Sequence, residues 1–305
     1  MDLKQKLQKM KIYKKSMSIL LLIFGLNLSA QRNEVKIIPV KVTDSIYMLK
    51  GSGGNIGVFM GNDGVFMIDD QFAPLTPKIL KVIDSLANDK VKYLINTHWH
   101  GDHTGGNENM AIEGAVILSH ENVRKRMNME QVIRGKKREA SPEEALPVIT
   151  FTEDISVHFN DENVLVSHVH NAHTDGDAIV FFMNNNVIHM GDTYFAGKYP
   201  YIDLNSGGSI NGYIEAAEKV SFLANYQTKI IPGHGDLSDK EELLKFKYML
   251  ITIKDNVQKE IDEGKTLEEV KKNTKITVDF DDEFGGGFIS AERFRETVYK
   301  SLTSE

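Results

Sequence analysis

Alternating apolar and polar residues predict a series of short strands in the first two thirds of the chain. Between residues 35 and 50 the two kinds alternate, as in a strand with one buried face. Residues 55–60 and 65–68 are two further strands, joined by Gly-Asn-Asp-Gly at 61–64, which is typical of a tight hairpin. The remaining predicted strands are short apolar segments: residues 91–95, 115–118, 155–159, 164–168, 178–183 and 187–189.

The apolar period lengthens to that of a helix at several places. Helices are predicted at residues 77–86, from Glu121 onward, and at 209–223, 239–263 and 291–302. Residues 125–144 are highly charged with almost no periodic core, which predicts a surface helix or a mobile insertion. Residues 283–288 form a glycine-rich loop before the last helix. Two runs of strands, each followed by helices, indicate one α+β domain of layered sheets with outer helices.

The first thirty residues are predicted to lie outside this domain. Six lysines between residues 4 and 15 precede a short apolar run at 19–28, and small residues precede Gln31. This pattern is typical of a secretory signal peptide. A membrane anchor is the alternative, but about ten apolar residues are too few to span a bilayer. We therefore expect a signal peptide at 1–30, a mature domain at 31–305 without a membrane span, and export to a periplasm or the medium.

Removal of residues 1–30 makes the protein more acidic. The net charge of −7 becomes −12, because 30 basic and 42 acidic side chains remain. An acidic protein without a basic stripe is a poor partner for the phosphate backbone of nucleic acids. The chain has no cysteine, which excludes disulfides and thiolate metal ligands. The absence of thiols suits an oxidising compartment.

The segment Thr-His-Trp-His-Gly-Asp-His at residues 97–103 carries the most specific chemistry. Three imidazoles and a carboxylate fall within six residues. These are ligands that zinc favours, and all are costly to bury without a partner. In a loop that leaves a strand, His98 and His100 can face one metal ion while Asp102 and His103 face a neighbouring one.

Three later segments supply further donors. Each lies between strands or directly after one, and each has a glycine nearby that lets the backbone approach closely. The donors are His173 in segment 171–177, Asp192 in segment 190–193 and His234 in segment 232–235.

In this order the motifs resemble those of the metallo-β-lactamase superfamily of hydrolases, over residues 36–236. The resemblance implies a four-layer αβ/βα sandwich with two metal ions at the edge between two sheets. It also implies that Asp69 supports the site from behind, while Asp70 is expected to be a surface or loop residue. The implied ligands are His98, His100 and His173 for the first metal, Asp102, His103 and His234 for the second, and Asp192 as the bridge between them.

The expected cofactors are two zinc ions, with iron or manganese as alternatives. Two zinc ions and two carboxylates leave enough positive charge to lower the pKa of a bound water from about 15.7 toward about 7. The predicted reaction is attack of a metal-bridging hydroxide on a small-molecule carbonyl, opening a cyclic amide or ester. Asp102 is the predicted orienting group for the nucleophile. Tyr194 is a candidate donor to the oxyanion, with a purely structural phenol as the equal alternative.

Differences within the family narrow this prediction. His100 disfavours an oxygen-reducing flavodiiron role, because those members carry an acidic residue in place of the second His. A persulfide-oxidising role uses one iron and does not need the second ligand set. The lactamases with a cysteine ligand are excluded, since Asp192 occupies that region. A lactonase or thioester hydrolase therefore stands beside a β-lactam-like activity, ahead of a metal-dependent nuclease and of a non-catalytic metal-binding protein.

Other residues receive weaker interpretations. Lys198 and Asn205 are candidates for gripping a substrate carboxylate or carbonyl, and Trp99 for walling the cleft. Substrate choice is expected to depend on loops 51–54, 121–146 and 194–211, while the oligomeric state is left open. The histidines expected to be structural are His120, His158, His168, His170 and His189, the last being close to the site in sequence.

Overall fold

The computed structural model describes residues 2, 5, 34–133 and 135–304. Contacts divide the chain into a unit that ends at Lys36 and a unit that comprises Ile37–Glu305. The predicted signal peptide lies outside the described residues, apart from Asp2 and Gln5. Among the helices that are described, none is both long and apolar enough to cross a membrane.

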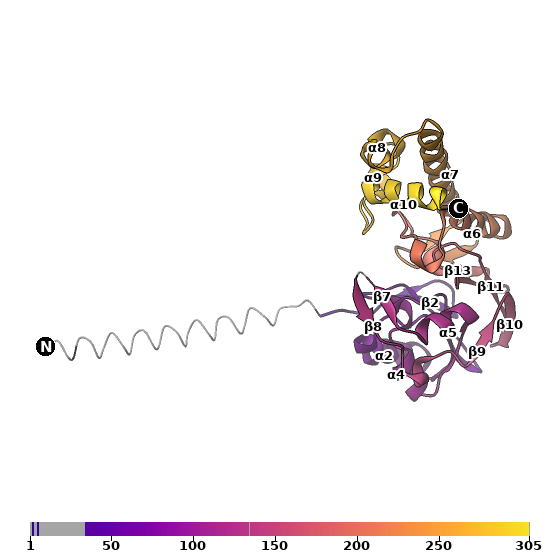
Figure 1. Ribbon diagram of the computed structural model, residues 1–305. Helices are drawn as coiled ribbons and strands as arrows, with labels where there is room; N and C mark the ends of the chain where they lie inside the picture. Colours follow the sequence, from indigo (N-terminus) through magenta and orange to yellow (C-terminus); the bar gives the residue numbers. More distant parts are fainter. Residues whose placement is uncertain (1, 3–4, 6–33, 134, 305) are drawn as a thin grey trace. The chain divides into compact units, whose positions relative to one another are not determined.

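Two mixed sheets form the centre of the larger unit, and a short hairpin stands apart from them (Figure 1). The first sheet has the order β1-β2-β3-β4-β5-β6-β9, with strands Ile38–Lys41, Ile46–Lys50, Ile56–Gly61, Gly64–Ile68, Val91–Asn96, Val116–His120 and Ile149–Phe151. The second sheet has the order β10 to β15, with strands Asp154–Phe159, Glu162–His168, Ala178–Phe182, Val187–His189, Lys229–Ile231 and Ser238–Asp239. The separate hairpin pairs β7 (Gln131–Ile133) with β8 (Lys136–Arg138).

Helices lie outside the two sheets, and the later ones gather beyond the second sheet (Figure 1). The α-helices are α2 (Thr76–Ala87), α3 (Gly101–Thr104), α4 (Asn107–Ile112), α5 (Glu121–Met127), α6 (Ile210–Leu223), α7 (Lys240–Asp262), α8 (Leu267–Lys272), α9 (Asp281–Phe284) and α10 (Ala291–Thr303). Short 3₁₀ turns are η1 (Ala73–Leu75), η2 (Glu143–Ala145), η3 (Gly191–Thr193), η4 (Leu204–Ser206) and η5 (Thr274–Ile276).

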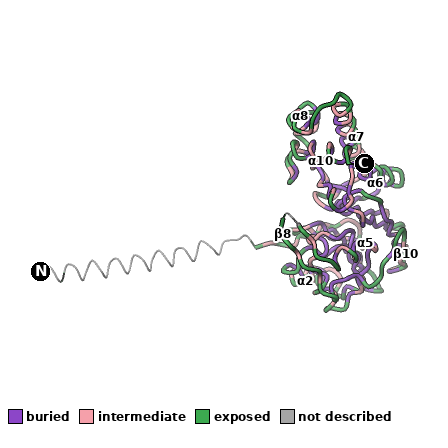
Figure 2. The backbone as a smooth tube through the Cα atoms, in the orientation of Figure 1, coloured by how far each residue is buried: buried purple, intermediate pink, exposed green. Residues whose placement is uncertain are grey.

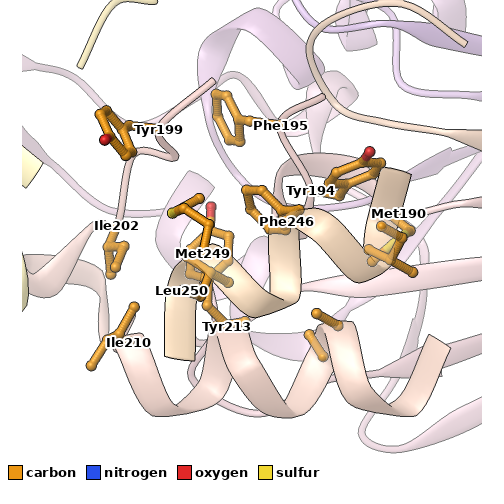
Figure 3. Close-up of a cluster of buried hydrophobic side chains, with 14 of the residues drawn as sticks. Met190, Tyr194, Phe195, Tyr199, Ile202, Ile210, Tyr213, Phe246, Met249 and Leu250 are labelled. Atoms are coloured by element: carbon orange, nitrogen blue, oxygen red, sulfur yellow. The ribbon is translucent and has the colours of Figure 1, made fainter. Parts of the chain in front are cut away.

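Buried residues are purple along the backbone in Figure 2, and the apolar ones form two large clusters. One cluster lies between the sheets, where Phe59 of β3 meets Phe182 of β12 edge to face at 5.2 Å between ring centroids. The other joins the outer face of the second sheet to α6, α7 and α10, with Tyr213 and Phe246 at its centre (Figure 3). Burial of these apolar faces is the main force that holds the layers together.

Parallel strand pairing places the loops that carry the predicted site residues next to one another. β4 pairs in parallel with β5 in the first sheet, and β13 pairs in parallel with β14 in the second. Because parallel strands end at the same edge, the loops that follow β4 and β5 are neighbours, as are those that follow β13 and β14. These four loops carry Asp69, His98, Asp192 and His234.

The observed architecture confirms the predicted α+β sandwich. Two local predictions were wrong. Residues 35–50 form two strands with a turn between them, not one strand. The charged segment 125–144 contains the end of α5 and the β7–β8 hairpin, because Gly135 turns the chain at a φ of 73° and β-branched Val132 favours a strand.

Candidate metal centre

Asp69 anchors the histidine-rich segment from behind. It follows β4 directly and adopts a left-handed φ of 58°. Its carboxylate accepts hydrogen bonds from the Thr97 backbone N–H at 2.7 Å and from Thr97 Oγ1 at 2.8 Å. It also pairs with Nδ1 of His103 at 2.7 Å, and all three residues are buried. Asp69 therefore fixes both ends of the segment, in the place that the family resemblance implied.

Asp70 lies in the same loop but is not at the surface. It is fully buried, and Oδ1 accepts a hydrogen bond from the Gly106 backbone N–H at 2.9 Å. Burial raises the pKa of Asp70 well above its usual value. Of the two expected alternatives, a surface or a loop residue, only the loop position holds, because this loop is covered by the turn that precedes α4.

The side chains predicted as ligands gather into two adjacent groups. Within each group, the possible ligand atoms all lie within 4.8 Å of one another. Four different loops supply them, together with the short helix α3. The first group is His98, His100, His173 and Asp192, and the second is Asp102, His103 and His234.

Asp192 lies between the two groups and turns one carboxylate oxygen toward each. Oδ2 is 3.5 Å from Nε2 of His173 and 3.9 Å from Nε2 of His98. Oδ1 is 3.1 Å from Nε2 of His103 and 3.3 Å from Nε2 of His234. This is the arrangement expected of a ligand shared by two ions.

Four of the histidines are held through the ring nitrogen that faces away from the site. An N–H on that nitrogen donates to a protein oxygen, which leaves the lone pair of the other nitrogen directed inward. Thr97 Oγ1 donates to Asp69, so it accepts from His98. The donor–acceptor pairs are His98 Nδ1 with Thr97 Oγ1, His100 Nε2 with Asp203 Oδ2, His103 Nδ1 with Asp69 Oδ2 and His173 Nδ1 with the Tyr201 carbonyl, at 3.1, 2.9, 2.7 and 2.7 Å.

Three atoms of the site test whether metal ions fit it. Nε2 of His98, Nε2 of His103 and Oδ1 of Asp192 are buried and have no hydrogen-bond partner among the described residues. Leaving such atoms unpaired costs free energy, and buried polar atoms are normally satisfied. All three are electron-pair donors that converge with the rest of their groups. A bound cation satisfies them, so the residues fit a metal.

The charges at the second group also favour a cation. Burial lowers the pKa of His103, but Asp192, Asp69 and Asp102 outweigh it and raise that pKa well above its usual value. Burial likewise lowers the pKa of His234, but Asp192 and Asp102 raise it to about 9. The surrounding carboxylates therefore attract positive charge, which a metal ion supplies in exchange for protons.

Two glycines allow the backbone to approach the ligands closely. A Cβ at Gly54 would lie 2.1 Å from Cε1 of His103, and a Cβ at Gly233 would lie 2.1 Å from Oδ1 of Asp192. Both contacts are shorter than real Cβ atoms show. Neither position accepts a larger residue unless a ligand moves.

Asp203 was missed by sequence reasoning. It precedes η4, about a hundred residues after His100, and its Oδ2 also accepts a hydrogen bond from Ser206 Oγ at 2.7 Å. The carboxylate of Asp203 orients the imidazole of His100 and makes it a stronger metal ligand. No motif in the sequence links the two residues, since only folding brings them together.

We expect Asp203→Ala to weaken zinc binding about 10- to 100-fold, the usual effect of removing such a support. Competition with a chromophoric chelator measures the affinity. Asp236→Asn is the control, because Asp236 is largely exposed and pairs only with Lys50 among the described residues. Unchanged zinc affinity in Asp203→Ala would show that His100 does not depend on this contact.

The His173 loop is held by two further carboxylates that the sequence reasoning also missed. Asp177 accepts from the backbone N–H groups of His173 and Thr174, at 2.6 and 2.9 Å. Asp175 forms a bidentate pair with Arg126 of α5, with both contacts at 2.7 Å. The His-x-x-x-Asp spacing from His173 to Asp177 is the signal that was present in the sequence.

Tyr194 does not face the metal centre. Its ring packs against Phe246 of α7 at 5.0 Å between centroids, inside the second cluster (Figure 3). Its hydroxyl is 2.7 Å from Ser238 Oγ, and burial raises its pKa. The prediction that it donates to an oxyanion was therefore wrong, because the chain leaves η3 with this side chain turned into the core. The next residue, Phe195, stacks on His234 at 4.9 Å.

Three of the remaining histidines make contacts outside the two donor groups. His189 is buried, with Nε2 3.2 Å from the Asn55 carbonyl and Nδ1 accepting from the Gly191 backbone N–H at 3.2 Å. It thereby supports the turn that carries Asp192. His120 and His168 stack on one another at 3.9 Å between ring centroids, outside both donor groups.

A cavity of about 620 Å³ opens onto the two groups. His100, Asp102, Asp192 and His234 reach it from the metal centre. Its walls carry several aromatic rings, and both Lys198 and Asn205 line it, as does Trp99. The lining aromatic residues are Phe72, Trp99, Phe195, Tyr199, Tyr201 and Phe288. The volume is that of a small-molecule site.

The sequence model of the Metallo-beta-lactamase superfamily matches residues 49–234, which is more than half of the chain and includes every residue of the two groups. The chain belongs to the metallo-beta-lactamase superfamily. The superfamily is generally hydrolytic, which supports a metal-dependent hydrolase with a candidate His/Asp metal site.

One curated relative, "Beta-lactamase-like protein 2 homolog" of Caenorhabditis elegans, is 26% identical over 162 residues. That match covers 53% of this chain and 48% of the relative, so the chain spans about half the relative's length.

Solved structures share the fold at low sequence identity. A metallo-beta-lactamase from Pontibacter korlensis has a TM-score of 0.60 at 16% identity, covering 70% of this chain and 99% of that one. The DIM-1 metallo-beta-lactamase has a TM-score of 0.58 at 17% identity, covering 72% and 99%. The sec-alkylsulfatase Pisa1 from Pseudomonas sp. has a TM-score of 0.67 at 13% identity, covering 88% of this chain and 50% of that one.

Proposed function

We propose that this chain is a dinuclear zinc hydrolase that opens a cyclic amide or ester in a small-molecule substrate. The observation that carries the proposal is the pair of donor groups on either side of Asp192, with three buried donor atoms that make no hydrogen bond among the described residues. Five imidazoles and two carboxylates, with no thiolate, form a donor set that suits zinc, and also iron or manganese. The cavity beside them is large enough for such a substrate.

The proposed ligands divide as the two groups do. His98, His100 and His173 would hold one ion, Asp102, His103 and His234 would hold the other, and Asp192 lies close to both groups. When bound, the two ions supply a hydroxide nucleophile at neutral pH and polarise the scissile carbonyl.

Asp102 is the group of this chain best placed to orient the attacking water. It lines the cavity, and its carboxylate Oδ2 is 3.4 Å from Nε2 of His234. Burial raises the pKa of Asp102, but His103 and His234 outweigh it and lower the pKa to about 2. The carboxylate is therefore ionised at neutral pH and accepts a hydrogen bond from water.

A substrate panel tests the reaction. Purified protein loaded with two equivalents of zinc is assayed on a cephalosporin, an acyl-homoserine lactone and a glutathione thioester, with metal-free protein as the control. We expect the loaded protein to hydrolyse the cephalosporin and the metal-free protein to hydrolyse none of the three substrates. Two solved structures that share the fold are metallo-beta-lactamases, so a β-lactam is the first substrate to test. Hydrolysis of none of the three, with two ions bound per chain, would contradict the proposal.

A lactonase or thioester hydrolase is the second candidate. The chain has no cysteine, and Asp192 is the residue between the two groups. Activity on the lactone or thioester, with none on the cephalosporin, would select this candidate. A nuclease is disfavoured by the net charge of −12 that remains without residues 1–30.

His103→Ala is expected to lower metal occupancy of the second group while it spares the first. The reason is that His103 contributes its Nε2 only on the Oδ1 side of Asp192. The metal content should fall from about two ions per chain toward one, as the two-site arrangement predicts. Equal loss of both ions would show that the assignment of His103 to one group is incorrect.

We also propose that residues 1–30 are a signal peptide and that the protein is exported. The support is the basic start, the short apolar run and the small residues before Gln31. Expression of the full chain in a bacterium, followed by N-terminal sequencing of the periplasmic fraction, is expected to find Gln31 first. An intact N-terminus on protein in the cytosolic fraction would contradict export.

A further inference from the structure

We propose that Arg138 of β8 binds a carboxylate of the substrate beside the metal centre. This inference rests on the proposed function, because it assigns part of the substrate that the same site would take. It adds a specificity residue from the β7–β8 hairpin, outside the two donor groups.

Arg138 differs from the other described arginines in having no protein partner. It is partly buried, and its side chain makes no hydrogen bond, ion pair or ring contact among the described residues. A guanidinium that lines a cavity and has no counter-charge is available to an anionic ligand. The other arginines have theirs: Arg124 donates to the Pro147 carbonyl, Arg126 pairs with Asp175, Arg293 lies over Tyr201 and Phe288, and Arg295 donates to Lys271 and Thr277.

The guanidinium lies next to the metal-binding segment. A Cβ placed on Gly101 would be 2.8 Å from Nη1 of Arg138 and 3.5 Å from its Cζ. Gly101 stands between His100 and Asp102, which belong to different donor groups. The glycine therefore leaves room for the guanidinium beside the backbone that links the two groups.

Arg138 also faces the cavity. It lines the cavity together with Gln131, its partner across the hairpin, and with Val132. A guanidinium presents parallel N–H groups that match the two oxygens of a carboxylate. A substrate with its scissile carbonyl at the metal centre and a carboxylate a few atoms away satisfies both features.

The neighbouring lysine on the same strand supplies a matched control. Side chains alternate along a strand, and Lys137 pairs with Glu130 at 2.6 Å with 69% of its side chain exposed. Lys137→Ala removes one positive charge from the hairpin without removing a group that lines the cavity.

The single tryptophan of the chain, Trp99, lines the cavity and reports on binding without any need for turnover. Zinc-loaded protein is titrated with 3-phenylpropanoate and with its neutral amide while the fluorescence of Trp99 is followed. We expect Arg138→Ala to weaken carboxylate binding about 10- to 100-fold, as for loss of a charged hydrogen-bonded partner, with amide binding unchanged. Arg138→Lys should recover part of the affinity, and Lys137→Ala should match the unchanged protein.

Several results would overturn the inference. One is equal affinity for the carboxylate in the unchanged protein and in Arg138→Ala. Another is a loss of carboxylate affinity in Lys198→Ala but not in Arg138→Ala. The third is that the unchanged protein does not bind the carboxylate. Zinc content and thermal unfolding show whether each variant is folded and loaded with zinc. If Arg138→Ala does not fold or does not bind zinc, Arg138→Lys is tested in its place. Because binding is measured apart from hydrolysis, failure of the substrate panel with Arg138-dependent binding intact would contradict the proposed function alone.

Discussion

Asp192→Asn is expected to cost the protein most of its bound metal at both groups. The two carboxylate oxygens face different groups, so one substitution weakens both. The amide keeps the shape of the side chain but removes its charge and one of its two acceptor oxygens. We expect metal content well below two ions per chain. We also expect kcat/KM on the active panel substrate to fall about 10³-fold or more, on the scale of losing a preorganised electrostatic group.

Metal analysis and steady-state kinetics measure these effects. Asp236→Asn is again the matched control, since it removes one exposed carboxylate that pairs with Lys50. A variant at position 192 that keeps two ions and near-normal kcat/KM would show that Asp192 does not join the groups.

Gly54→Ala is expected to displace His103 and with it the second metal ion. The added methyl carbon would lie 2.1 Å from Cε1 and 2.4 Å from Nε2 of His103. The imidazole cannot yield freely, because it is fully buried and its Nδ1 is held by Asp69 at 2.7 Å. We expect a stability loss of about 1–3 kcal/mol, typical of overpacking. We also expect metal occupancy that resembles that of His103→Ala.

Thermal unfolding of the metal-free protein isolates the packing effect, and metal analysis reports the second ion. Gly286→Ala is the control, because nothing lies within 4 Å of the Cβ it would add. Normal stability together with two bound ions in Gly54→Ala would mean that the loop before β3 moves aside without cost.

The sequence predicted the long, periodic elements and all the members of the two donor groups. The helices α6 and α7 were predicted almost to the residue, since their apolar period is sustained over many turns. The donors were predictable because His98 to His103 lie within one short segment and each later donor lies in a segment that contains a glycine. The division of these donors into two groups depends on how the chain folds. That division was predicted from the family resemblance and not from the residue spacing.

Predictions failed where side-chain direction or long-range pairing decides the outcome. The turn η3 directs Tyr194 into the core and Phe195 toward the cavity, which residue spacing cannot reveal. The contact of Asp203 with His100 joins segments about a hundred residues apart. The β7–β8 hairpin was hidden because its charged residues masked the alternation of a strand.

The most direct test is an anomalous difference map from a crystal of the zinc-loaded protein, recorded on both sides of the zinc absorption edge. The predicted result is two zinc peaks. One lies among His98, His100 and His173, the other among Asp102, His103 and His234, with Asp192 in contact with both. A single peak, or peaks away from these residues, would contradict a two-metal centre at this site.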